Sequence, residues 1–130
     1  MIVVDTSAML AILLREPGAG ELANRLAMSG DVLISAGTLS EMYIVASRRG
    51  IFERLDELLA RIKPEIVPVT EEVAQQIGAI YRQWGKGFHP AGLNFGDCFA
   101  YALAKDRDLP LLFVGNDFVR TDIRPAIGFA

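Results

Sequence analysis

The sequence is poor in cysteine and has no excess of positive charge. Its single cysteine, Cys98, excludes an internal disulfide framework and fits a reducing compartment. The formal net charge of −3 argues against a protein that binds nucleic acid through a broad basic surface. It does not argue against an enzyme that holds phosphate through metal ions, because such a site must itself be acidic.

Long apolar runs and a secretory signal are also missing. The chain begins with Met1-Ile2-Val3-Val4-Asp5, without a basic leader, and no apolar run approaches the roughly 20 residues of a membrane helix. We therefore expect a soluble, cytoplasmic protein without a membrane contact. What is present is a globular composition, with 52% hydrophobic and 22% charged residues, and a length that predicts one domain over residues 1–130.

Short apolar runs alternate with segments of helical period along the chain. The runs at 2–4, 32–34, 66–69 and 111–114 are continuous, as in parallel strands that are buried on both faces. Pro68 indicates that the third strand lies at an edge, because proline donates no hydrogen bond. This order predicts an α/β fold with three layers, α/β/α, around a central, mostly parallel sheet. The helices are expected at 6–14, 21–28, 38–49, 52–62, 71–84 and 95–107.

Four acidic residues occupy positions that this topology brings to one edge of the sheet. Asp5 directly follows the first strand, and Asp117 lies just past the last one. Helices that follow parallel strands begin at the same edge, and we expect Glu41 and Asp97 in the first turns of two of them. Ligands of open α/β sheets bind at the carboxyl ends of the strands, so the four side chains are expected to share one site.

Carboxylates gathered in this way repel one another unless cations neutralise them. A pair of unit charges about 4 Å apart costs roughly 4 kcal/mol at an effective dielectric constant of 20. A ligand set made only of oxygen atoms favours Mg²⁺ or Mn²⁺ over zinc. Two such ions can activate a water molecule and stabilise the leaving oxygen of a phosphodiester.

Each acidic residue also has an ordinary structural explanation. Asp5 can cap the following helix, and Thr38 with Glu41 matches the capping-box pattern. Asp97 is favoured near a helix start by the helix dipole, and Asp117 is typical of a turn. Only their joint placement at one edge favours a functional site.

Three segments of the chain resemble the VapC-type ribonucleases of the PIN-domain family. They are the opening stretch 2–8, the stretch 89–104 around Asp97, and the stretch 111–118 followed by 121–123. The resemblance runs from end to end, and its two terminal motifs are specific, whereas the region of Glu41 is looser. It implies a PIN-like fold and an Mg²⁺- or Mn²⁺-dependent endoribonuclease. It also implies the toxin of a type II toxin–antitoxin pair, inhibited by a VapB-like antitoxin and usually homodimeric.

The resemblance also implies roles for the acidic residues. Asp5 and Asp97 would be the principal metal ligands, Glu41 would bind metal or orient the water, and Asp117 would complete the site. Relatives often carry a second aspartate where this chain has Asn116, which brings no charge. Asp122 is a possible substitute at this fourth position.

We expect hydrolysis by in-line attack of a metal-activated water that leaves a 5′-phosphate. A packed core position is the expected role of Cys98 rather than a nucleophilic one. Each candidate substrate contact has a structural alternative, as a helix cap, a helix-end cation or an exposed loop residue. These candidates are Thr6, Ser7, Arg82, Lys86, His89 and Asn116.

Three other functions are alternatives for the same acidic pattern, although two of them need a residue that this chain lacks. A phosphatase of the haloacid-dehalogenase type needs a second aspartate where this chain has Ser7, and a receiver domain needs a late lysine, whereas Lys105 lies inside a predicted helix. A catalytically silent PIN scaffold that binds RNA or a protein is the non-enzymatic alternative. The apolar residues of 13–26 and 52–62 predict either a homodimer or antitoxin surface or a larger internal core.

Overall fold

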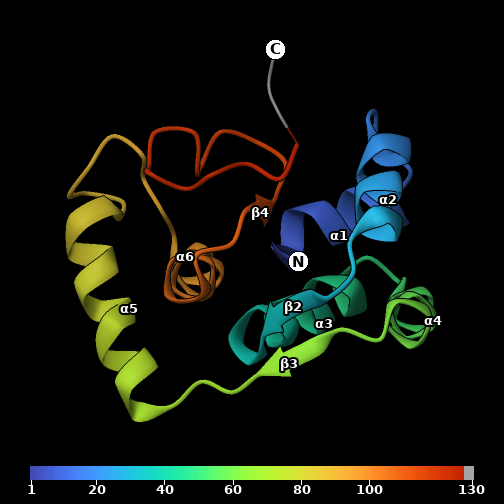
Figure 1. Ribbon diagram of the computed structural model, residues 1–130, viewed down its shortest axis with the longest axis horizontal. Helices are drawn as coiled ribbons and strands as arrows, with labels where there is room; N and C mark the ends of the chain where they lie inside the picture. Colours follow the sequence, from blue (N-terminus) through green and yellow to red (C-terminus); the bar gives the residue numbers. More distant parts are fainter. Residues whose placement is uncertain (128–130) are drawn as a thin grey trace.

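A four-stranded parallel sheet forms the centre of the computed structural model, which describes residues 1–127 (Figure 1). Its strands are β1 (Ile2–Val4), β2 (Val32–Ser35), β3 (Glu65–Val67) and β4 (Leu111–Leu112), in the order β3-β2-β1-β4. Each of the three strand pairings is parallel, so the expected parallel sheet is confirmed. The expected edge position of the third strand is confirmed as well.

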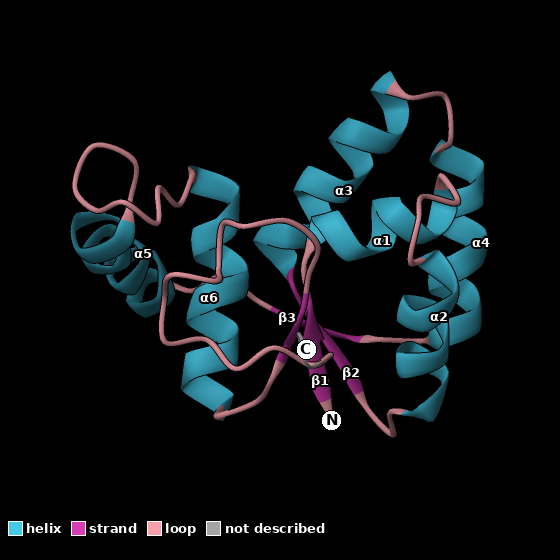
Figure 2. Ribbon diagram, turned by 90° about the horizontal axis from the view of Figure 1, so that it is seen from above, coloured by secondary structure: helices cyan, strands magenta, loops and turns pink. Residues whose placement is uncertain are grey.

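Helices cover both faces of this sheet, as the sequence predicts. Figure 2 shows α5 and α6 together on one side of the strands, and the other helices across the sheet from them. Two hydrophobic clusters match this division, because Ile2 and Val4 belong to one and Val3 to the other. The helices are α1 (Thr6–Leu13), α2 (Ala19–Met28), α3 (Ala36–Arg48), α4 (Phe52–Ile62), α5 (Glu71–Trp84) and α6 (Phe95–Arg107).

Alternation along the strands produces the two cores. Successive side chains of a strand point to opposite faces, and here both faces are covered, so all three residues of β1 and all four of β2 are buried. The apolar residues expected to form either a binding surface or a larger core belong mainly to the core. Leu22, Leu26, Leu55 and Leu58 are at most 9% exposed.

Some boundaries differ from those that the sequence predicts. Helix α3 begins at Ala36 rather than at residue 38, because the hydroxyl of Ser35 accepts a hydrogen bond from the amide of Gly37 and so caps the helix (3.2 Å). Ser35 is also the last residue of β2, so no loop separates the strand from the helix. Strand β3 ends at Val67, before Pro68.

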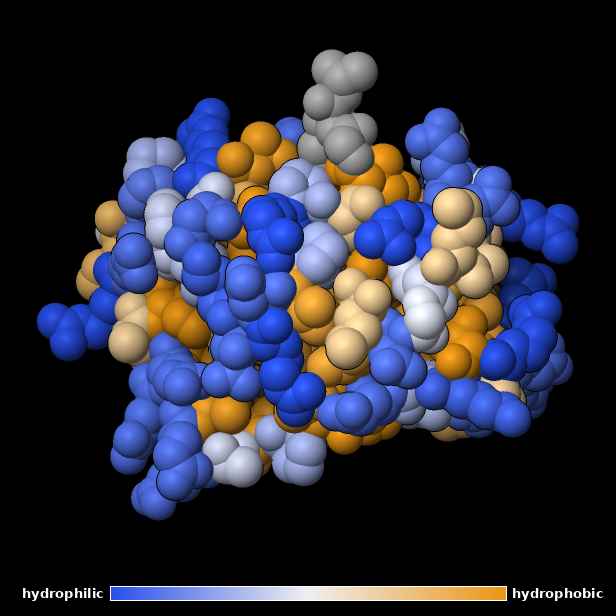
Figure 3. All heavy atoms as spheres, in the orientation of Figure 1, coloured by the Kyte–Doolittle hydropathy of each residue, from blue (hydrophilic) through white to orange (hydrophobic). Residues whose placement is uncertain are grey.

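Apolar and polar side chains are mixed on the surface. Figure 3 shows apolar side chains in patches between hydrophilic ones on one face of the molecule. Among residues 1–127, no helix has the length and apolar character needed to cross a bilayer.

The central strand should carry more of the stability than the edge strand. Ile34 of β2 and Ile66 of β3 are paired in register, but Ile34 is fully buried and Ile66 is 38% exposed. Replacing Ile34 with alanine leaves a cavity and should lower the free energy of unfolding by about 2–5 kcal/mol. The matched change Ile66→Ala should cost about 1 kcal/mol or less, measured by urea denaturation. Equal losses would contradict this placement.

Candidate acidic site

Asp5 joins the end of β1 to the start of α1. Its Oδ2 accepts hydrogen bonds from the amide (3.1 Å) and the hydroxyl (2.6 Å) of Ser7, so it caps the helix. The Ser7 hydroxyl oxygen accepts a further bond from the amide of Val114, just past β4 (3.0 Å). Asp5 is 4% exposed, and its Oδ1 is buried without a hydrogen-bond partner. One carboxylate oxygen is thus fixed, and the other is available to a ligand.

Glu41 approaches Asp5 from α3. The hydroxyl of Thr6 donates a hydrogen bond to its Oε1 (2.6 Å), so the first residue of α1 holds it in place. Its carboxylate also lies against Gly96 of α6, where any added Cβ would overlap it. The expected first-turn position and the capping box with Thr38 are both wrong. Because Ser35 caps the helix, Glu41 lies in the second turn.

Asp97 is the third residue of α6 and is 7% exposed. Its amide donates to the side chain of Asn94 (2.8 Å), and its Oδ2 accepts from the amide of Asn94 (3.0 Å). This reciprocal pair is a capping box, which fixes the orientation of the carboxylate at the helix start. The expected first-turn position of Asp97 is therefore confirmed.

The remaining acidic residues differ in where they lie. Asp117 is exposed in the turn after β4, and its charge acts on Asp97. Asp122, the possible substitute for the fourth acid, has other partners. It accepts hydrogen bonds from Tyr101 (2.6 Å) and Lys105 (2.9 Å), which help to lower its pKa despite its partial burial. The structure therefore gives Asp122 a role in the packing of α6.

The charges of neighbouring acidic residues raise the pKa values of Asp5 and Asp97. Burial, which is the largest cause, and the charge of Glu41 raise the pKa of Asp5 from 3.8 to about 6, against the hydrogen bonds from Ser7. Burial and the charges of Asp5 and Asp117 raise the pKa of Asp97 to about 8, against the hydrogen bond from Asn94. Glu41, Asp5, Asp97 and Asp117 thus form a connected acidic row, which costs free energy when it is fully ionised.

Comparisons with known proteins identify the family of the chain. The sequence model of the PIN domain matches residues 2–124. The chain belongs to the PIN-domain family. Its relatives include ribonuclease VapC28 of Mycobacterium tuberculosis, which is 45% identical over 96% of this chain and 97% of its own length. Ribonuclease VapC30 of the same organism is 41% identical over 93% of this chain and 95% of its own.

Solved structures share the fold of this PIN domain. The toxin VapC20 of M. tuberculosis, described as cleaving the sarcin-ricin loop, matches with a TM-score of 0.73 and 19% identity, over 96% of this chain and all of its own. VapBC2 of Rickettsia felis, solved with a DNA fragment from its promoter, matches with a TM-score of 0.70 and 18% identity, over 96% of each chain. At these identities the likeness shows the fold.

The acidic row of this PIN domain suits a hard divalent cation by its chemistry. As the side chains stand, no three acidic, histidine or cysteine residues within 1–127 form a group that could hold a metal ion. The row nevertheless offers only oxygen donors and includes the buried, unpartnered Oδ1 of Asp5. Carboxylates that repel one another stand apart, and a divalent cation would draw them together. The residues therefore fit Mg²⁺ or Mn²⁺.

The candidate substrate contacts separate into two groups. Thr6 and Ser7 bind the acidic carboxylates directly, in addition to their places in α1. His89 packs its ring against Trp84, and its Nδ1 accepts a hydrogen bond from the amide of Ala91 (2.9 Å), so it supports the loop before α6. Neither cavity that adjoins the acidic row is lined by His89, and the same holds for the exposed Arg82 and Lys86.

Arg120 is a candidate contact that the sequence analysis did not include. It lines a cavity of about 400 Å³ together with Asn116 and Asp117. Arg120 follows Asp117 by three residues in the same turn region, and this short spacing is the sequence signal that could have identified it. Cys98 is fully buried, and burial raises the pKa of its thiol to about 11, as expected for a core position.

The raised pKa values predict a falling stability as pH rises. The folded protein binds protons more tightly than the unfolded chain at Asp5 and Asp97, whose ordinary pKa is 3.8. Their contribution is therefore complete below pH about 4 and is lost as pH rises towards about 8. In excess chelator, Asp97→Asn should raise the free energy of unfolding by about 1 kcal/mol or more at the upper end of this pH range.

Urea denaturation of both proteins across this pH range checks the prediction. At the lower end the two should differ little, because the carboxyl of Asp97 is then neutral in both the folded and the unfolded chain. A wild-type protein whose advantage over Asp97→Asn grows with pH would contradict it.

Proposed function

We propose that this PIN domain is a metal-dependent endoribonuclease that acts as the toxin of a toxin–antitoxin pair. The observation that carries the proposal is the buried, unpartnered Oδ1 of Asp5 next to Glu41 and Asp97. Curated relatives at 41–45% identity are named VapC ribonucleases and support the reaction. A toxin that cuts cellular RNA acts in the cytoplasm, and we expect the protein there.

Asp5 and Asp97 would hold Mg²⁺ or Mn²⁺, with Glu41 and Asp117 beside them. The bound ion would activate a water molecule for attack on phosphorus and stabilise the charge on the leaving oxygen. The described side chains prepare this site. Ser7 fixes one oxygen of Asp5 and leaves the other available, and the capping box holds Asp97 beside Asp5.

Glu41 and Arg120 complete the proposed machinery from opposite ends of the row. Thr6 binds Oε1 of Glu41 and so orients the carboxylate that would position the attacking water. Arg120 lies beside Asp117 and would hold an RNA phosphate, which a planar guanidinium binds through paired donors. Asn116 lines the same cavity and adds a neutral donor and acceptor without another negative charge.

We further propose a VapB-like antitoxin and a second copy of the chain as protein partners. Similar folds support the first partner, since they include a toxin–antitoxin complex of Klebsiella pneumoniae, with a TM-score of 0.72 and 18% identity over 94% of this chain and 93% of its own. The homodimer follows from the family resemblance. Exposed apolar residues away from the acidic row, such as Phe52 and Met28, would suit such contacts.

Removing one central carboxylate should abolish RNA cleavage. We expect Asp97→Asn to cut single-stranded and structured RNA more than about 100-fold more slowly, since loss of even an outer partner of a metal site costs about 10–100-fold. Cleavage should require Mg²⁺ or Mn²⁺ and stop in excess chelator, measured by the appearance of 5′-phosphate products.

Asp122→Asn is the matched control, because it makes the same substitution at an acid held by Tyr101 and Lys105. It should retain activity within about threefold, in line with an acid that contacts neither substrate nor metal. Equal cleavage by wild type and Asp97→Asn would defeat the assignment. A folded wild-type protein that binds RNA and never cuts it would favour the silent scaffold.

A further inference from the structure

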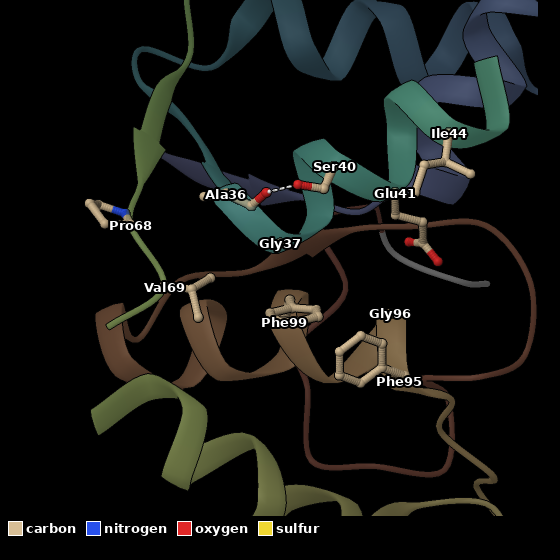
Figure 4. Close-up of a pocket in the computed structure, with 10 residues that line it drawn as sticks. All are labelled: Ala36, Gly37, Ser40, Glu41, Ile44, Pro68, Val69, Phe95, Gly96 and Phe99. Carbon is tan, nitrogen blue, oxygen red and sulfur yellow. Dashed lines mark hydrogen bonds between the residues drawn. The ribbon is translucent and has the colours of Figure 1, made fainter. Parts of the chain in front are cut away.

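An apolar groove lies between α3 and α6, next to the acidic row. Figure 4 shows the residues of α3 on one side, Phe95 and Phe99 of α6 on the other, and the segment after β3 at one end. Its volume is about 600 Å³, within the range of clefts that enclose small organic groups, about 300–1,000 Å³. The lining residues are Ala36, Gly37, Ser40, Glu41, Ile44, Pro68, Val69, Phe95, Gly96 and Phe99.

Aromatic surface is unusually exposed along this groove. Phe95 is 69% exposed, although it begins α6, a helix in which eight of the 13 residues are buried. Its ring meets Phe99 edge-to-face, with centroids 4.9 Å apart and planes at 79°. Ile44, 60% exposed, extends the apolar surface across the groove.

Two glycines fix the shape of the groove. The ring of Phe99 lies directly against Gly37 of α3, so that any Cβ there would overlap it. Gly96 of α6 receives the Glu41 carboxylate in the same way. The two helices therefore approach each other closely at these points, where a side chain of one helix lies against the backbone of the other.

The groove is continuous with the proposed reaction site. Glu41 belongs to both, because it lines the groove and accepts the hydrogen bond from Thr6 beside Asp5. Phe95 precedes the metal-binding candidate Asp97 by two residues on the same helix. Gly96, which receives the Glu41 carboxylate, lies between Phe95 and Asp97, so the groove and the acidic row meet at Glu41.

The charge of the groove favours a nucleobase over a phosphate as the part of a nucleic acid that binds there. None of its lining residues is a lysine or arginine, and its one charged residue is Glu41, so a phosphate there would be repelled. An uncharged, planar nucleobase meets none of that repulsion and stacks on aromatic rings. On the other side of the row, Arg120 offers the cation that a phosphate needs.

We propose that this groove binds an unpaired nucleobase of the RNA, next to the phosphate that is cut, by stacking on Phe95. The proposal rests on the nuclease function above and adds a contact between this groove and the base beside the cut. A base within a duplex is stacked and paired on both sides, so it cannot enter. Because every base has a flat face, the groove selects strand geometry more strongly than sequence.

Binding of a fluorescent RNA tests the groove without cleavage. The probe is a single-stranded oligonucleotide with 2-aminopurine at successive positions, titrated with the full chain in Ca²⁺ in place of Mn²⁺, and electrophoresis verifies that the RNA stays intact. Wild type should change the fluorescence at one or two positions. Phe95→Ala should weaken binding about tenfold and abolish that change, as expected for the loss of one stacked base. Phe95→Trp should preserve both, and Phe95→Leu should behave like alanine.

Phe88→Ala is the matched control, because Phe88 is 62% exposed and does not line the groove. It should bind as wild type does. Because Phe95 is exposed, its variants should fold as wild type does, which circular dichroism verifies. Cleavage of the same RNA with Mn²⁺ should show a KM about tenfold higher for Phe95→Ala and an unchanged kcat. Duplex RNA of the same sequence should bind wild type and Phe95→Ala equally.

The outcomes separate the two proposals. If wild type neither binds nor cuts RNA, the nuclease function fails and the groove proposal with it. If wild type cuts and binds while Phe95→Ala does both equally well, only the groove proposal is overturned. It is also overturned if Phe95→Ala converts a dimer into a monomer with unchanged RNA affinity per chain, since the groove would then be a protein interface.

Discussion

Carboxylates that are withdrawn from water and placed side by side cannot all stay ionised without an opposing charge. This constraint governs the carboxyl edge of the sheet, where Asp5 and Asp97 are almost fully buried. The charge of Glu41 opposes the ionisation of Asp5, and the charge of Asp5 opposes that of Asp97. A fold shaped only by stability would place apolar or paired groups there, since removing unpaired charge from a core is commonly neutral or stabilising. The unfavourable electrostatics therefore support the proposal that this edge is the functional part of the molecule.

The surrounding structure holds the acids in place against their repulsion. Ser7 binds Asp5 and also accepts the amide of Val114, so the site is tied to the chain beyond β4 as well as to β1. Thr6, the residue before Ser7 in α1, holds Glu41 by a hydrogen bond. Thr6 and Ser7 both belong to the first turn of α1, and their hydroxyls also orient carboxylates. The alternatives posed by the sequence, helix start or functional contact, therefore do not exclude each other.

The sequence predicted the layers and most elements because continuous apolar strands and helical periods are local signals. It predicted the edge positions of Asp5 and Asp97 because each follows directly from the end of a strand or the start of a helix. It misplaced Glu41 because Ser35 and Thr38 are both good N-caps, and the end of β2 decided between them. The Asn94–Asp97 capping box was readable from spacing alone and was overlooked.

Features that depend on packing between distant segments were not predictable in this way. The exposure of Phe95 follows from how α3 crosses α6, and the close approach at Gly37 and Gly96 sets that crossing. Likewise, Arg120 and Asp117 line one cavity through a turn with no periodic pattern, and Arg120 donates to the carbonyl of Pro90 (3.4 Å). Both lie beside the acidic row, which is the proposed reaction site, so local patterns say least about the positions that would determine substrate choice.

Thermal unfolding with Mn²⁺ tests the acidic row most directly, because it needs neither an RNA substrate nor turnover. At pH 8, where the carboxylates repel most, saturating Mn²⁺ should raise the Tm of wild type by about 5 °C or more, since an ion that binds only the folded protein stabilises it. The double variant Asp5→Asn/Asp97→Asn should show no such rise. Equal rises in the two proteins, or none in wild type, would contradict a cation site built from these carboxylates.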